Sequence, residues 1–326
     1  MTWLLVRKFL RDVRPALLVI CFLLIAFSAF WTKIAQRVTT EIAPFFNGMA
    51  LMNNINPKLL DEIVFKGPGK VAQSVMGGAD VRFEKPSDFL AVELLHPVVL
   101  FLTGMWVIGR AAGAVSGELD KGTMELLLSQ PVPRGRLIVA HFLVDCIVIP
   151  CVCLSIVLGT QIGLELIGPF AVDYSILEKL MANAPVKFKP PPGPAVLEVN
   201  AQRQIWGTVN LAAMMFAFSG ITMFVSSCGR NRWRTLGWAA LIYVLMFMVN
   251  VIGQLWDAAG FLRPFTLFFY YQPQKIWLAH DWYVNVNEVW PGAPSVPVLP
   301  VLLVVGALGY GLAYRVFTRR DLPAPL

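Results

Sequence analysis

The chain has 326 residues, of which 57% are hydrophobic and 14% are charged, and its formal net charge is +7. Because a soluble domain is less apolar and more charged than this, we predict an integral membrane protein. The positive charge does not indicate nucleic-acid binding, since Lys and Arg fall beside apolar runs and form no basic helix or aromatic RNA-binding pattern. The five cysteines show no spacing typical of a disulfide framework or a metal centre.

The first apolar run extends from Pro15 to Trp31 and follows four basic residues. The run is long for the core of a signal peptide and has no convincing cleavage site, so we predict an uncleaved first span. The residues before Pro15 are expected to form an amphipathic helix on the membrane surface, with Trp3, Leu4 and Phe9 facing lipid.

Five further apolar runs are each long enough to cross a bilayer as a helix. With the first run they predict an all-α polytopic fold of six transmembrane helices, in which residues 1–326 form a single membrane domain. Spans two to six are expected at roughly Leu90–Val115, Leu137–Leu164, Ile205–Ser227, Leu236–Leu255 and Val298–Phe317.

The density of Lys and Arg predicts the orientation of these spans. Lys and Arg are denser in both termini, in the segment 116–136 and in the turn CGRNRWR than in the other connections. Because short basic connections stay in the cytoplasm, we expect both termini to be cytoplasmic. Residues 33–89, 165–204 and 257–297 are then external loops.

Each external loop has its own sequence character. In the first loop, Asn56 and Pro57 are typical of a helix start, and GPGK at 67–70 lacks the spacing of a phosphate-binding loop. The second loop contains the stiff stretch KPPPGP at 189–194. The third is rich in aromatic residues suited to the membrane interface, namely Phe268, Phe269, Tyr270, Tyr271, Trp277, Trp282 and Tyr283.

Small and polar residues predict helix contacts inside the membrane. Gly109, Gly113 and Gly117 form two overlapping GxxxG spacings in the second span, which favour close helix packing. A polar stripe in the fourth span, formed by Ser219, Thr222 and Ser226, is interpreted as a further helix contact.

Three ionisable residues lie toward the inner ends of spans two and three: Arg110, His141 and Asp145. An ionised group at the centre of a membrane costs about 2.5 to 3.5 kcal/mol, so we expect these groups to pair or to face water. His141 and Asp145 are one helical turn apart. Two interpretations remain open: a gate that changes when the cytoplasmic segment moves, and a static ion pair that holds two helices together.

The cytoplasmic segment between spans two and three has the sequence GELDKGTMELLLSQPVPRGR. We predict a short helix over Thr123–Ser129, capped by Asp120 or Thr123 and stopped by the prolines at 131 and 133. About seven residues are too few for a stable isolated helix in water.

One face of this short helix is apolar. Met124, Leu127 and Leu128 have the i, i+3, i+4 spacing of such a face, while Glu125 and Ser129 point elsewhere. The face is therefore expected to dock against a partner protein or against the lipid headgroup layer.

This segment resembles the coupling segment of ABC-2 type transporter permeases. The residues that carry the resemblance are Glu118, Lys121, Gly122, Thr123, Leu126, Leu127, Leu128, Pro131, Val132 and Arg134. The stretches PSDFLAVELLHPVV, FSGITMFVSSCGRNRW and FYYQPQKIWL are also similar to that family, in its order, so the resemblance covers most of the chain.

The resemblance implies a type V-like permease in the cell (inner) membrane. In that architecture the coupling helix, with Met124 and Glu125 in it, rests in a groove of a separate cytoplasmic ATPase, which binds ATP and Mg. The permease works as a homodimer or beside a paralogous permease, and the family favours export of a solute.

The sequence carries no catalytic motif that would suggest an enzyme. His96, His141 and His280 are isolated, and no HExxH pattern is present. We expect no catalytic residue, metal site or cofactor in this chain. The alternative to a transporter is a membrane scaffold or maturation factor that an ATPase partner drives without moving a solute.

Overall fold

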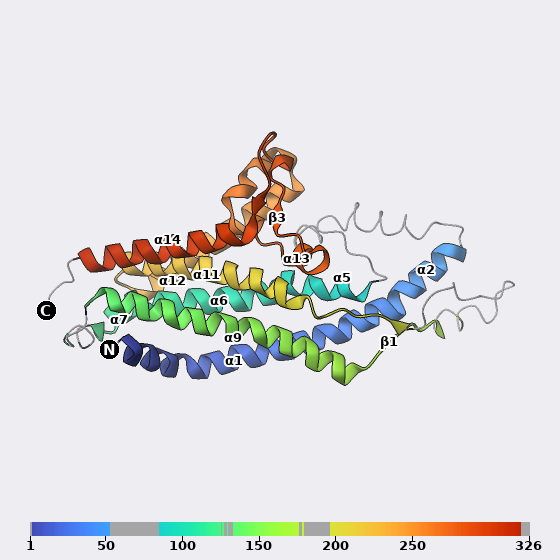
Figure 1. The fold of residues 1–326 in the computed structure, drawn as a ribbon, viewed down its shortest axis with the longest axis horizontal. Coiled ribbons are helices and arrows are strands. Elements are labelled where there is room, and N and C mark those ends of the chain that lie inside the picture. Colours follow the sequence, from blue (N-terminus) through green and yellow to red (C-terminus); the bar gives the residue numbers. More distant parts are fainter. Residues whose placement is uncertain are drawn as a thin grey trace.

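The computed structural model describes residues 2–52, 85–124, 126, 129, 133–175, 178 and 196–320. Long helices run side by side along the longest axis of the molecule (Figure 1). Among the described residues, six helical stretches are long and apolar enough to cross a membrane: Thr2–Met49, Pro86–Ala114, Gly135–Ile167, Gln204–Cys228, Arg232–Leu255 and Val298–Arg319. The prediction of a helical fold with six candidate spans is confirmed.

The first helix is longer than the sequence predicted. α1 (Thr2–Arg37) continues through Pro15 and runs directly into the π-helix η1 (Val38–Ile42) and α2 (Ala43–Met52). Residues 33–52 are therefore helical rather than loop. The remainder of the predicted first loop, with Asn56, Pro57 and the GPGK stretch, lies outside the described residues.

The start of α1 also differs from the prediction of a separate surface helix. Trp3 and Leu4 are exposed, but Phe9 is buried and does not face lipid. The reason is that α1 lies along α9 (Gly135–Ile167), so the face of α1 that carries Phe9 is covered by protein.

The second span is built from two helices joined by a tight turn. α5 (Pro86–Ala91) leads into the 3-10 helix η2 (Val92–Leu95), and α6 (Pro97–Ala114) follows. His96 begins α6, because its Nδ1 accepts a hydrogen bond of 3.2 Å from the backbone N–H of Val98.

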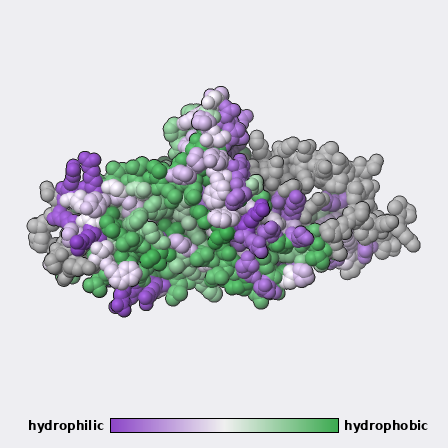
Figure 2. All heavy atoms as spheres, viewed as in Figure 1, coloured by the Kyte–Doolittle hydropathy of each residue, from purple (hydrophilic) through white to green (hydrophobic). Residues whose placement is uncertain are grey.

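The remaining spans are α9, α11 (Gln204–Cys228), α12 (Arg232–Leu255) and α14 (Val298–Arg319). α11 is central, because it packs against α14, α6 and α9. α12 is peripheral and buries only Thr235, Ala239, Asn250 and Gly253 within the chain. Figure 2 shows apolar side chains over the middle of the bundle and hydrophilic ones gathered near the end that holds the termini.

Glycines allow two pairs of helices to approach closely. A Cβ added to Gly309 of α14 would lie 2.4 Å from the backbone of Gly220 on α11. On α9, a Cβ added to Gly159 would lie 2.6 Å from the carbonyl oxygen of Ile25 on α1. Neither site tolerates a side chain unless the helices move apart.

The glycines that the sequence selected do not make such contacts within the chain. A Cβ at Gly109 would meet nothing within 4 Å, and those at Gly113 and Gly117 would meet only the side chain of Arg232 or local backbone. Among the described residues, no neighbouring helix backbone approaches these three positions, so close helix packing there stays a prediction. GxxxG spacing permits close approach, but it does not fix which face receives a neighbouring helix.

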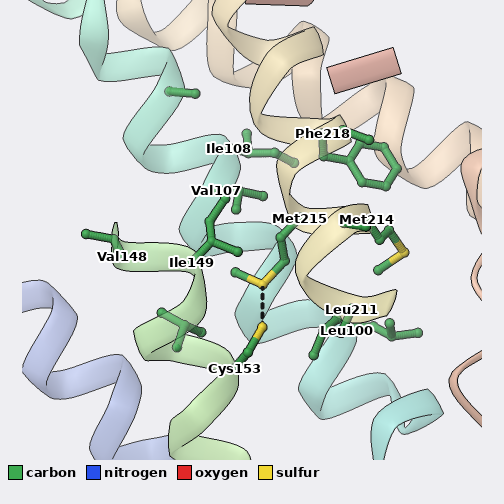
Figure 3. Close-up of a cluster of buried hydrophobic side chains, with 14 of the residues drawn as sticks. Leu100, Val107, Ile108, Val148, Ile149, Cys153, Leu211, Met214, Met215 and Phe218 are labelled. Atoms are coloured by element: carbon green, nitrogen blue, oxygen red, sulfur yellow. Dashed lines mark hydrogen bonds between the residues drawn. The ribbon is translucent and has the colours of Figure 1, made fainter. Parts of the chain in front are cut away.

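An apolar cluster fills the middle of the bundle between α6, α9 and α11 (Figure 3). Its buried side chains include Leu100, Val107, Ile108, Val148, Ile149, Cys153, Leu211, Met214, Met215 and Phe218. The Cys153 thiol on α9 contacts the Met215 sulfur on α11 at 3.8 Å. This cluster forms an apolar layer across the bundle.

Residues 257–297 form a lobe on one side of the bundle, part of which stands off it, whereas α13 packs against α11, α5 and η2 (Figure 1). Its elements are η3 (Asp257–Phe265), η4 (Leu267–Phe269), α13 (Pro273–Ala279), β3 (Tyr283–Val284), η5 (Val286–Glu288) and β4 (Val296–Pro297). Within the lobe, β3 pairs antiparallel with β4. A second antiparallel pair lies outside the lobe and joins β1 (Phe170–Ala171) to β2 (Val196–Leu197).

The aromatic residues of this lobe correct the expectation of a membrane-interface loop. Phe268, Phe269, Tyr271 and Trp277 are buried inside the chain, whereas Tyr283 is exposed. Phe268, Tyr271 and Trp277 belong to the main core, and Phe269 belongs to a smaller cluster with Ile276 and Val284. Aromatic composition alone does not distinguish an interfacial belt from buried core residues. The KPPPGP stretch of the second loop lies outside the described residues.

Candidate functional site

A buried ion pair joins the second and third spans. Arg110 on α6 pairs through Nη2 with Oδ2 of Asp145 on α9, and their side chains are only 5% and 1% exposed. The same guanidinium donates a 3.3 Å hydrogen bond to the carbonyl oxygen of His141, one helical turn away on α9. Arg110 therefore holds α6 to two successive turns of α9.

The ring of His141 lies against the same arginine. Arg110 Nη1 is 3.5 Å from Nδ1 of His141. Because a guanidinium only donates hydrogen bonds, this contact requires an unprotonated Nδ1. The imidazole ring also stacks on the ring of Phe9 of α1, with the two ring centroids 4.1 Å apart. Phe9 thus attaches the first helix to this cluster.

Two further helices contribute hydroxyl groups that the sequence did not assign to the cluster. Ser219 of α11 donates a 2.7 Å hydrogen bond to Oδ2 of Asp145, and the hydroxyl of Tyr310 on α14 donates to the same oxygen. The hydroxyl oxygens of Ser219 and Tyr310 are also within hydrogen-bond distance of each other, at 3.1 Å. The sequence predicted a helix contact at Ser219. It did not indicate a role for Tyr310, because a single tyrosine in a span is not by itself evidence of a buried polar site.

The cluster links five of the six candidate spans: α1 through Phe9, α6, α9, α11 and α14. Arg110 Nε and His141 Nε2 are buried without a hydrogen-bond partner. A buried ion pair of this kind is sensitive to helix movement, because separating its members leaves an uncompensated charge.

The segment 116–136 begins at α7 (Ser116–Asp120), which is bonded to the end of α11 and to the turn that follows it. The backbone N–H of Ser116 donates to Ser226 Oγ at 3.1 Å. Asn231 donates to the Asp120 carboxylate at 2.9 Å. Arg110 lies six residues before Ser116, so the ion pair and this segment share one stretch of chain.

Gly122 ends α7. Its φ is +69°, a left-handed conformation that glycine adopts readily, and its N–H bonds to the carbonyl of Leu119 at 3.1 Å. The Thr123 hydroxyl donates to the Glu118 carboxylate. The Asp120 carboxylate accepts from Asn231. The helix predicted over Thr123–Ser129 lies mostly outside the described residues, so its capping by Asp120 or Thr123 stays a prediction.

The apolar residues of this segment divide between the core and the surface. Met124 is only 2% exposed and belongs to the core, so its expected place on an exposed docking face is wrong. Leu126 is 72% exposed, and Lys121 is exposed as well. The other positions predicted for this segment, Glu125, Leu127, Leu128 and Pro131, lie outside the described residues.

The end of the segment is bonded to the C-terminal end of α14. Arg134 donates to the carbonyl oxygen of Arg320 at 3.0 Å. Arg320 in turn donates to the carbonyl oxygens of Ser227 and Gly229, both at 2.8 Å. Both termini and α7 lie at this end of the bundle (Figure 1).

In the part of the chain that the structure describes, no group of three His, Cys, Asp or Glu residues is placed to hold a metal ion. The polar groups of this site are thus held by one another and by backbone.

The family model described as "ABC-2 family transporter protein" matches residues 3–322, which is nearly the whole chain. The match includes the ion pair, the segment 116–136 and the six candidate spans. No curated protein matches this chain.

Proposed function

Because the chain belongs to the ABC-2 family of transporter proteins and is a multi-pass membrane protein, we propose that it is the permease subunit of an ATP-driven transporter. Permeases of this family generally pair with an ABC ATPase. In this proposal the ATPase is a separate cytoplasmic subunit that binds ATP and Mg, two permease copies or paralogues form the pathway, and the solute is exported.

The observation that carries this proposal is the exposed leucine in a segment fixed at both ends. Leu126 is exposed, while Asp120 before it is bonded to the α11–α12 turn and Arg134 after it to the end of α14. A partner that binds Leu126 would therefore push on helices rather than on a free loop.

The same contacts suggest how such a push reaches the membrane interior. Movement of α7 would act on α6 through the backbone between Ser116 and Arg110, and movement of Arg134 would act on the start of α9. Arg110 and Asp145 lie on these two helices. We propose that their separation changes during the ATPase cycle, so that the ion pair serves as a gate between helix arrangements.

The experiment tests docking at Leu126. Leu126→Asp places a charge in an apolar contact, so the amount of ATPase that co-purifies with the chain from detergent-solubilised membranes should fall about tenfold or more. The amount of permease in the membrane should stay near normal, because Leu126 is exposed in the folded chain.

Ser129→Asp is the matched control, because it adds the same charge at an exposed position three residues later without removing an apolar side chain. It should reduce ATPase recovery much less. Full recovery and full ATPase stimulation with Leu126→Asp would contradict the proposed docking site. Absence of any co-purifying ATPase from the unchanged protein would contradict the proposed complex.

A further inference from the structure

A second buried polar site lies far from the ion pair, at the start of the second span. Glu93 in η2 has no exposed surface, and in the described part of the chain no Lys or Arg side chain pairs with it. An isolated carboxylate in such a place is costly, since it loses its water and gains no opposite charge.

Helices α9 and α11 each supply a hydrogen-bond partner of this carboxyl group. Thr160 Oγ1 donates to Oε2 of Glu93 at 3.0 Å. Gln204 Nε2 is 3.4 Å from the same oxygen and 2.7 Å from Thr160 Oγ1. Ser28 of α1 lies beside the same carboxyl group. We call Ser28, Glu93, Thr160 and Gln204 the Glu93 box.

Glycines allow the helices around the Glu93 box to approach one another closely. A Cβ on Gly159, next to Thr160, would lie 2.7 Å from Cβ of Ser28. A Cβ on Gly207, one turn after Gln204, would lie 2.7 Å from the Leu94 side chain next to Glu93. The close approach of α1 and of α11 therefore encloses the carboxyl group in protein.

Three buried oxygens in the box make no hydrogen bond of ordinary geometry with the described residues: Glu93 Oε1, Gln204 Oε1 and Ser28 Oγ, which lies beside the carboxyl group. The Gln204 amide oxygen can only accept, and so can Oε1 of Glu93 as long as the carboxyl group is ionised. A proton on Oε1 converts that oxygen into a donor toward the amide or hydroxyl oxygen. It also removes the buried charge.

We propose that Glu93 is a proton-binding site and that its carboxyl group is neutral in the closed Glu93 box. The proton resides on Oε1, and Oε2 continues to accept from Thr160. This inference does not depend on the proposed transport function, because it rests on the contents of the box alone.

The ion pair cannot neutralise Glu93. Asp145 and Thr160 are fifteen residues apart on α9, which is about 22 Å along a helix. The apolar cluster of Figure 3, with Cys153 on the same helix, lies between them. Arg110 is therefore separated from Glu93 by an apolar layer.

Other titratable groups near the box provide no positive charge to the carboxyl group. The Tyr271 hydroxyl donates to the carbonyl of Leu94 at 2.6 Å. His96 uses Nδ1 to accept from Val98 and packs against Phe27 and Trp31. Cys153 contacts Met215, and Asp88 of α5 is itself an acid.

The test is infrared spectroscopy of the reconstituted protein near neutral pH, with the spectrum of each variant subtracted from that of the unchanged protein. The unchanged protein should show the carbonyl stretch of a protonated carboxylic acid, and Glu93→Gln should lack that band. Glu198→Gln is the matched control, because Glu198 is exposed and its loss should leave the band unchanged. A spectrum in which Glu93→Gln removes only carboxylate bands would overturn the proposal.

Stability provides a second readout. Glu93→Gln reproduces the shape and neutrality of the protonated acid, so it should fold and keep its melting temperature, while Glu93→Ala should lower the melting temperature by several degrees. A Gln variant that fails to assemble in the membrane contradicts the proposal. A melting temperature that rises with added Na⁺ or K⁺, and does so only when Glu93 is present, would also overturn it, since the box would then hold a metal cation.

Discussion

Asp145 is the acceptor around which the buried cluster is arranged, because Arg110, Ser219 and Tyr310 all direct hydrogens to its Oδ2. Its removal leaves the Arg110 guanidinium buried without an opposite charge. Breaking a buried ion pair from one side typically costs about 3 to 5 kcal/mol, whereas removing both members costs less. The pair is therefore best tested by comparing single and double changes.

We expect Asp145→Ala to destabilise the protein by about 3 to 5 kcal/mol and to lower its amount in the membrane. The double change Arg110→Ala with Asp145→Ala should be milder than either single change. Thermal unfolding in detergent, analysed as a double-mutant cycle, measures the difference. If the two single losses simply add, the two side chains do not interact in the working protein.

Tyr310→Phe tests the hydroxyl contribution while it keeps the ion pair. A hydrogen bond to a charged group is worth about 1.5 to 3 kcal/mol, so this change should cost less than Asp145→Ala and should retain the aromatic packing against Phe142 and Phe216. Tyr314→Phe on the same helix is a control, because the Tyr314 side chain is exposed. Equal losses from both changes would mean that the Tyr310 hydroxyl contributes nothing specific.

At the scale of single residues, the sequence predicted the ionisable members of the buried cluster but did not predict its aromatic members. Arg110, His141 and Asp145 could be selected because ionisable groups inside a membrane need partners. Phe9 and Tyr310 could not, because aromatic residues are ordinary in spans and their contacts join α1 and α14 to a distant part of the chain. Glu93 was visible as an acid near a span end, but its burial depends on the packing of three other helices.

At the scale of helices, α11 and α14 pack closely because the glycines at their contact carry no side chain. A Cβ on Gly309 would lie 2.4 Å from the carbonyl carbon of Gly220, which is backbone and cannot rotate away. A Cβ on Gly311, two residues later on α14, would meet nothing within 4 Å. The two positions therefore provide a matched comparison of a contact face and an open face.

Gly309→Leu should separate α11 from α14, with partial loss of Ser219 and Tyr310 from the Asp145 cluster. We expect a loss of about 1 to 3 kcal/mol or more, typical of overpacking, seen as a lower melting temperature in detergent. Gly311→Leu should be close to neutral. If the two variants unfold at the same temperature, the helices are not in close contact at Gly309.

At the scale of the whole molecule, one end of the bundle collects the features expected in the cytoplasm. Both termini, α7 and the α11–α12 turn lie there, and Arg134 and Arg320 bond across it. The sequence predicted the number of spans well, because long apolar runs require helices in a membrane. It predicted loops poorly at 33–52 and 257–297, because polar or aromatic composition does not exclude helical or packed structure.

The sidedness of this arrangement is predicted from charge density, and cysteine labelling of intact cells tests it. In a protein whose native cysteines are replaced by alanine, Ser295→Cys in the lobe should react with a membrane-impermeant maleimide, because the position is exposed and the lobe is expected outside. Ser129→Cys, exposed in the cytoplasmic segment, should react only after the membrane is permeabilised. Labelling of both positions in intact cells would place the segment and the lobe on one side. Since an odd number of membrane crossings must separate two positions on opposite sides, that result would leave an even number between them and exclude the predicted arrangement, in which α9, α11 and α12 all cross.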